Sequence, residues 1–259
     1  MKKTIAIVAL AGVAAAANAQ VGRAVSENAI DDNFVSETIT ILPGYDGNAM
    51  LNGSWSLGDM FGITSRPDAG SALPFAMADD SLFGFPGDNL GIIDENDNGR
   101  FFGLVDSVNG NNADGFGTAE WLFDITGATG LSISIDFAAM GDFESSDTHL
   151  FEVDIDGGGF TTLFEATVDQ DGFQTYTMAD GGVYDYDDPM YMNGSILNNN
   201  FATLSEMVAG TGSTLTLRYT GEGNGGSEAF AFRNVTVVPT PGALALLGMG
   251  GLFASRRRR

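Results

Sequence analysis

Alternation of apolar and polar residues is the clearest pattern in the middle of this chain. Residues 131–137, 151–156 and 215–219 alternate with period two, and the second run stops at three consecutive glycines. Period two places one strand face in a core and the other in water, as in antiparallel sheets. Further strands are expected where apolar runs are bounded by Gly, Asn and Asp: residues 34–42, 101–105, 121–125, 160–164 and 173–178.

These short strands predict an all-β fold, specifically an antiparallel β-sandwich of the jelly-roll kind. No repeat of fixed period is present, which disfavours a propeller or a solenoid. Residues 201–208 (FATLSEMV) are the one helical candidate, long enough for about two turns or for an irregular link. We expect one domain over residues 20–237, because no linker rich in Pro and Ser interrupts it. A separate small unit within residues 21–100 is the alternative.

The last expected strand contains a change of phase. Phe230 and Phe232 share one face of a strand, whereas Val235 and Val237 share the other. A β-bulge at Arg233 and Asn234 would reconcile the two phases. A strand buried on both faces is the alternative, which the charge of Arg233 disfavours.

Residues 1–19 have the layout of a secretory signal peptide. Lys2 and Lys3 form a basic start, an uncharged apolar run covers residues 4–16, and Ala17-Asn18-Ala19 matches the small-x-small cleavage pattern. We expect export and a mature chain beginning near Gln20. The alternative is a buried N-terminal helix.

The C-terminal residues 238–259 form a tail in three parts. Val238-Pro239-Thr240-Pro241 is followed by an apolar run over residues 243–255 and a basic end of Arg256, Arg257, Arg258 and Arg259. The apolar run is shorter than the ~20 residues of a comfortable membrane span. The arginines are expected to stay cytoplasmic and to halt export.

This order resembles the PEP-CTERM sorting signal, in which Pro-Glu-Pro precedes a transmembrane helix and an arginine-rich end. Thr240 stands where that family has Glu. The resemblance implies a short transmembrane helix, processing by an exosortase-type enzyme, and placement at the cell surface or in the extracellular matrix. A plain anchor that is never cleaved is the alternative.

Charge is distributed very unevenly along the chain. Both lysines lie in the leader and four arginines lie in the tail, so five arginines face 34 acids in between, a formal charge of −29. Such a surface repels phosphate backbones, and no nucleic-acid partner is expected. It attracts divalent cations, and it also suits a salty medium.

A second resemblance covers roughly residues 85–237. The segments 91–110, 137–144 and 226–235 look like a jelly-roll module of secreted bacterial proteins, including non-catalytic regions of extracellular nucleases. The resemblance implies the fold and says little about function. That family usually has Asp where Arg233 stands here.

Catalytic chemistry finds little support in the sequence. The chain has no cysteine and one histidine, His149, so thiol nucleophiles, Cys-ligated metals and multi-histidine centres are excluded. His149 has acids and serines beside it, but a surface or strand-end histidine is favoured over a catalytic triad. The acids are too numerous to single out a glycosidase pair.

Calcium is the better candidate ligand, because it takes six to eight oxygens. The segment from Asp94 to Gly99 matches the first half of an EF-hand loop, but Val105 occupies the closing position, which favours a polar turn. We expect one structural Ca²⁺ at a second place, formed by Asp142, Glu144, Asp147 and Glu228.

The sequence thus predicts a non-enzymatic exported protein that binds polysaccharide or other surface components. Residues 184–191, rich in Tyr and Asp, read as a loop that either stacks on sugars or packs its own rings. A secreted polysaccharide hydrolase and a scaffold made rigid by calcium are the two alternatives.

Overall fold

A computed structural model describes residues 22–26, 34–41, 50–51, 59–83, 88–108 and 115–239. The expected signal peptide and the tail beyond Pro239 lie outside these described residues, so their predicted roles stay predictions. Within the described ranges, no helix is long and apolar enough to cross a membrane.

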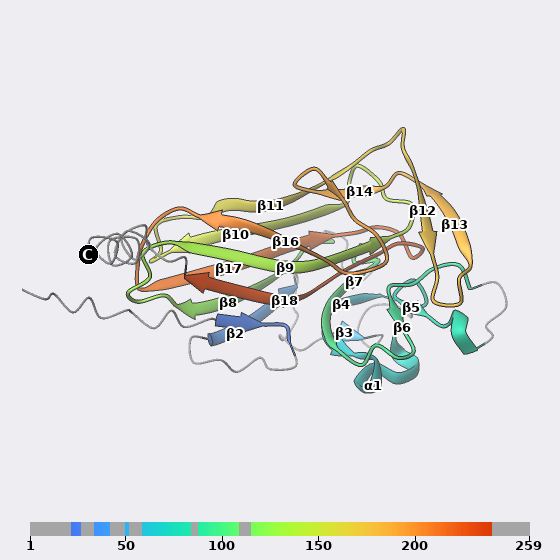
Figure 1. The fold of residues 1–259 in the computed structure, drawn as a ribbon, viewed down its shortest axis with the longest axis horizontal. Helices are drawn as coiled ribbons and strands as arrows, with labels where there is room; N and C mark the ends of the chain where they lie inside the picture. Colours follow the sequence, from blue (N-terminus) through green and yellow to red (C-terminus); the bar gives the residue numbers. More distant parts are fainter. Residues whose placement is uncertain are drawn as a thin grey trace, which may run out of the picture.

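Two large antiparallel sheets dominate the described chain (Figure 1). In the first, the strand order is β16-β9-β18-β7-β4-β3, and β1 also pairs with β18. In the second, the order is β15-β14-β11-β10-β17-β8-β2. The first sheet consists of β1 (Gly22–Ala24), β3 (Met50–Leu51), β4 (Met60–Ser65), β7 (Arg100–Val105), β9 (Leu131–Met140), β16 (Ala202–Val208) and β18 (Ala229–Pro239). The second consists of β2 (Phe34–Ile41), β8 (Gly117–Asp124), β10 (Thr148–Ile155), β11 (Thr161–Val168), β14 (Met190–Met192), β15 (Ser195–Ile196) and β17 (Thr214–Glu222).

The connectivity of eight of these strands is that of a jelly roll. The neighbours β7-β18-β9-β16 lie in one sheet and β8-β17-β10-β11 in the other, so the chain crosses between sheets in two interleaved Greek keys. The predicted antiparallel sandwich of jelly-roll type is therefore confirmed.

Alternating residues of the two sheets meet in an inner core of large aromatic rings. Trp121, Phe151 and Tyr219 project from the second sheet toward Phe102 and Phe232 of the first. The ring centroids of Phe151 and Tyr219 lie 4.7 Å apart, and those of Phe102 and Phe232 lie 4.8 Å apart. The period-two pattern of the sequence thus supplies this core directly.

The outer face of the first sheet is also covered at one end. Phe101 and Ala231 point away from the inner core and pack in a second core with Met77, Ile93 and Tyr176. The covering elements gather at one end of the sandwich (Figure 1). They are α1 (Arg66–Ala69), η1 (Gly70–Ala72), β5 (Ala78–Asp79), η2 (Ser81–Phe83), β6 (Ile93–Asp94) and the hairpin of β12 (Phe173–Thr177) and β13 (Val183–Asp187). Of the strand pairs described, β5 and β6 are parallel.

Strand β18 contains the predicted bulge. Its register with β9 shifts between Arg233 and Thr236, and Asn234 has a φ of 54°. Before the bulge, residues Ala229 to Phe232 are buried on both faces of the strand. The alternative prediction, a strand buried on both faces, therefore also holds for this first half of β18. On its other side, β18 pairs with β7 before the bulge and with β1 after it.

Two local expectations were wrong. Residues 202–208 form strand β16 and not a helix, because seven consecutive residues pair with β9 and this pairing overrides their helix propensity. The Tyr-rich stretch forms strands β13 and β14 and not a loop. Tyr184 and Tyr186 turn inward onto the second core, and Tyr186 donates a hydrogen bond to the carbonyl of Asn89.

Candidate functional site

A polar cavity of about 720 Å³ opens where β18 changes partner from β7 to β1. We call it the arginine cavity, because Arg23 from β1, Arg100 from β7 and Arg233 from β18 all line it. The rest of its lining is Ser26, Asn96, Asp97, Asn98, Gly99, Asn234 and Thr236. The cavity therefore lies beside the bulge, where the pairing of β18 passes from β7 to β1.

Arg233 is held in place by contacts on two sides. Its Nη1 lies 2.7 Å from Oδ2 of Asp97, and its guanidinium carbon lies 3.9 Å from the ring centroid of Phe201. Its buried Nε has no hydrogen-bond partner in the described chain, and neither has the buried hydroxyl of Ser26. These two buried atoms are polar groups without a partner among the described residues, beneath the cavity wall.

The EF-hand-like segment forms one wall of this cavity and is a polar turn, as favoured. Oδ1 of Asp94 accepts a hydrogen bond from the backbone of Asn96, and Oδ1 of Asp97 accepts one from Gly99. Arg233 occupies the other oxygen of Asp97. These carboxylates are thus used within the turn, and the chemistry of the cavity is that of arginines and amides.

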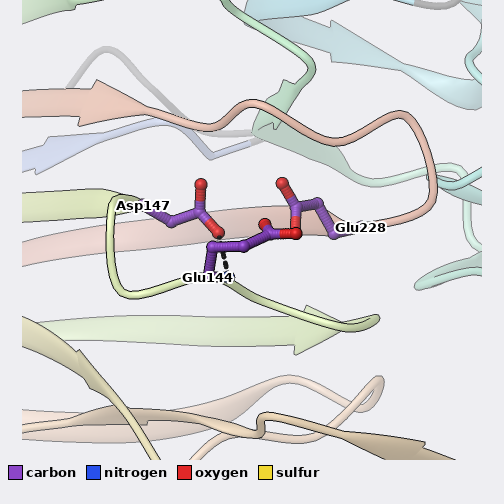
Figure 2. A group of neighbouring side chains, drawn as sticks. All are labelled: Glu144, Asp147 and Glu228. Atoms are coloured by element: carbon purple, nitrogen blue, oxygen red, sulfur yellow. Dashed lines mark hydrogen bonds between the residues drawn. The ribbon is translucent and has the colours of Figure 1, made fainter. Parts of the chain in front are cut away.

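Three carboxylates meet at a different place, between the β9–β10 loop and the start of β18 (Figure 2). Glu144, Asp147 and Glu228, here the carboxylate cluster, each offer an oxygen within 4.8 Å of the others. Asp147 and Glu228 are buried, whereas Glu144 is exposed. The structure thus brings together three of the four predicted metal ligands.

Backbone N–H groups fix the orientation of the cluster. The amide of Glu144 donates to Oδ2 of Asp147 over 2.7 Å, and the amide of Gly225 donates to Oε1 of Glu228 over 2.7 Å. The amide of Asn224 donates to Oδ1 of Asp147 over 3.3 Å. No donor reaches Oε2 of Glu228 in the described chain, although that residue is only 3% exposed.

Gly141 allows the two loops to approach so closely. Its φ is 137°, and a Cβ at this position would lie 2.5 Å from Cα of Glu228. Only glycine combines this backbone conformation with this contact. The Gly141–Asp142 sequence alone gives no sign of which segment it touches.

Burial and mutual repulsion dominate the electrostatics of the cluster. Desolvation, followed by the charges of Asp147 and Glu144, raises the pKa of Glu228 to about 9. Desolvation, opposed by the hydrogen bond from Glu144, raises the pKa of Asp147 to about 6. Without a cation, the buried pair therefore holds at least one proton near neutral pH.

Asp142, the fourth predicted ligand, lies outside the cluster. Its side chain is exposed, and its pKa is raised by partial desolvation and by the charges of Asp187, Asp188 and Glu144. Asp142 is thus part of a wider acidic surface beside the cluster.

His149 lies at the start of β10, as the strand-end expectation had it, and it is only 2% exposed. The expectation of a surface position was wrong. Its Nδ1 lies 2.8 Å from the hydroxyl of Tyr219. Burial lowers the pKa of His149 to about 3, so the ring is neutral. The hydrogen-bond partner of His149 is thus a buried core tyrosine and not a serine or an acid of a catalytic triad.

Comparisons with known proteins identify no family. No family model matches the chain, and no curated protein matches it. Among solved structures, the xylan-binding CBM22-1 domain of Paenibacillus barcinonensis Xyn10C is similar, with a TM-score of 0.25 and 8% identity over 80% of this chain and 96% of that chain. The CBM22-1–GH10 modules of Clostridium thermocellum xylanase 10B, complexed with xylohexaose, give a TM-score of 0.27 and 9% identity over 56% of this chain.

This chain spans 23% of the length of that xylanase chain. Both TM-scores are too low to transfer a binding site or a ligand. The strand order of this chain alone establishes that the fold is an antiparallel jelly-roll sandwich. The features of the described chain that bear on function are the arginine cavity and the carboxylate cluster.

Proposed function

We propose that this chain is an exported, non-enzymatic protein of the cell surface or extracellular matrix that binds a carboxylate-bearing polysaccharide in the arginine cavity. The observation that carries the proposal is the gathering of Arg23, Arg100 and Arg233 around one cavity. They are three of the five arginines that lie between the leader and the tail.

Arginine suits the carboxylate of a uronic acid, because its planar guanidinium donates two parallel hydrogen bonds to two carboxylate oxygens. The amides of Asn96, Asn98 and Asn234 offer both donors and acceptors, which match the hydroxyl groups of a sugar ring. The cavity is thus polar in the manner that an acidic sugar requires.

The strongly negative chain imposes a characteristic salt dependence on this binding. A formal charge of −29 outside the leader and tail repels a polyanion at long range. At physiological ionic strength the Debye length is about 8 Å, so distant repulsion is screened while contacts within the cavity persist. We expect binding to be tightest at intermediate salt and weaker at both extremes.

Export is supported by the leader at residues 1–19 and by the tail that resembles the PEP-CTERM signal. In this proposal an exosortase-type enzyme processes the tail, and the apolar run contacts the membrane before that step. Fractionation of cells with tagged protein tests this. Protein in the envelope or medium that begins near Gln20 supports export, whereas an intact leader in cytosolic protein contradicts it.

Binding is tested with the full-length protein by calorimetry against polygalacturonate and against neutral xylan. Arg100→Gln removes one cavity charge. Arg218→Gln is the matched control, because Arg218 pairs with Glu120 within the second sheet and does not line the cavity. Losing one charged hydrogen bond of about 1.5–3 kcal/mol predicts roughly 10- to 100-fold weaker binding for Arg100→Gln. Equal affinities for the two variants, or release of reducing ends from either polymer, would overturn the proposal.

A further inference from the structure

The carboxylate cluster contains more negative charge than the described residues compensate. The ion pairs of Arg66, Arg218 and Arg233 in the described chain go to Asp80, Glu120 and Asp97, and none of them reaches the cluster. Burying a carboxylate without a cation or a full set of donors is unfavourable. Glu228 is in this position, with Oε2 unpartnered and only 3% of the residue exposed.

We propose that Glu144, Asp147 and Glu228 bind one calcium ion, which links the β9–β10 loop to the loop before β18. This inference concerns a metal site and does not rest on polysaccharide binding in the arginine cavity. Figure 2 shows the three carboxylates turned toward a common space, with Glu144 and Asp147 on one loop and Glu228 on the other.

The spacing of the oxygens suits calcium. Two oxygens that bind the same Ca²⁺ at 2.3–2.6 Å lie at most about 5 Å apart, and the cluster oxygens lie within 4.8 Å of one another. A common ion therefore requires only small side-chain movements. The exposed side of Glu144 leaves room for the waters that would complete six to eight ligands.

The donor set also separates calcium from other metals. All three groups are carboxylates, which are hard oxygen ligands. His149, the single histidine, directs Nδ1 to Tyr219, and the chain has no cysteine. Zinc and copper sites therefore lack their usual ligands, and Mg²⁺ demands a stricter octahedron at a shorter distance than carboxylate oxygens up to 4.8 Å apart supply.

A shared proton is the competing way to neutralise the cluster. The raised pKa of Glu228 is the expected sign of crowded buried acids, and it fits an ion-free cluster as well as one awaiting a cation. The two states differ in their response to added calcium. A cluster that holds only a proton gains no stability from the ion.

The experiment follows thermal unfolding of the full-length protein in EDTA and in a calcium series, with calorimetry of Ca²⁺ binding alongside. At calcium a hundred times Kd, we expect a rise in melting temperature of about 5–10 °C. Glu228→Gln keeps an acceptor for the Gly225 amide and needs no proton. We expect this variant to melt in EDTA no lower than the unchanged protein and to lose the calcium response.

Asp142→Asn is the matched control, since it removes an exposed acid beside Glu144 that the cluster does not include. It should keep the full calcium response. Asp147→Asn provides a second test of the cluster and should lose the response. An unchanged melting temperature at millimolar calcium, or a response of Glu228→Gln equal to that of Asp142→Asn, would refute the calcium site.

Discussion

Burial of His149 should remove part of the stability of this fold in mild acid. The ring is 2% exposed, its Nδ1 lies 2.8 Å from the Tyr219 hydroxyl, and the Phe230 ring centroid lies 3.9 Å from its own. No carboxylate is bonded to it among the described residues, so nothing there favours the charged form. Burial lowers its pKa from 6.5 to about 3 in the folded protein.

The sign of the effect follows from proton uptake. Above pH 6.5 both states carry a neutral imidazole, and His149 contributes no pH dependence. Between pH 6.5 and 3 the unfolded chain gains a proton that the folded chain excludes, so stability falls by about 1.4 kcal/mol per pH unit. At pH 5 this is a loss of about 2 kcal/mol. The free energy of unfolding of a typical protein is about 5–15 kcal/mol, so the loss is a large part of it.

The assay is urea unfolding in EDTA at pH 7.5, 6 and 5 for the unchanged protein and for His149→Gln. Acids with a raised pKa, such as Glu228, stabilise the fold as pH falls, but they do so equally in both proteins. Their contribution therefore cancels in the difference between the two free energies of unfolding. We expect that difference to shrink by about 2 kcal/mol between pH 7.5 and 5.

A direct check uses the fact that the chain has one histidine, whose ring protons give a single set of NMR signals. We expect these signals not to titrate in the folded protein down to pH 5. Titration near pH 6.5, or parallel stability curves for the two proteins, would show that burial does not suppress the charge.

Further predictions concern packing and can be checked by the same unfolding assay. Gly141→Ala should destabilise by about 2–4 kcal/mol, through a positive φ and a Cβ 2.5 Å from Glu228 Cα. Gly157→Ala, with a φ of 74° and open space around it, has a backbone cost and no clash, and should destabilise by about 1 kcal/mol. Phe232→Ala should cost about 3–5 kcal/mol, whereas Phe173→Ala, at a residue 77% exposed, should stay within about 0.5 kcal/mol.

The fold was predictable because its strands follow the simplest pattern. In β17 and in residues 131–137 of β9, alternate residues are buried, and the sequence shows this without knowledge of their partners. Strand β16 was mistaken for a helix because Ala, Leu, Glu and Met favour helices locally, while the deciding contacts come from β9, which lies about 70 residues earlier in the chain. Local sequence cannot report such a distant partner.

The two candidate sites differ in how visible they are in sequence. Glu144 and Asp147 are near each other in the chain, and Glu228 was expected beside them from the loop before the last strand. The arginine cavity was not anticipated, because it depends on a bulge that makes β7 and β1 share one strand. The sequence offered one indirect sign of this cavity, namely that only five arginines lie among 34 acids between the leader and the tail.

Strand β18 connects these sites and also separates them. Glu228 precedes its first residue and Arg233 follows five positions later, about 16 Å along an extended chain. The intervening residues from Ala229 to Phe232 are buried on both faces, and coupling through them would need a second packed arrangement that both sites favour. We therefore expect calcium to raise the melting temperature without changing polysaccharide affinity by more than about twofold, a coupling well below the usual allosteric range. Loss of polysaccharide binding in EDTA by a protein that is still folded would contradict this independence, and it would favour a binding site at the carboxylate cluster over one in the arginine cavity.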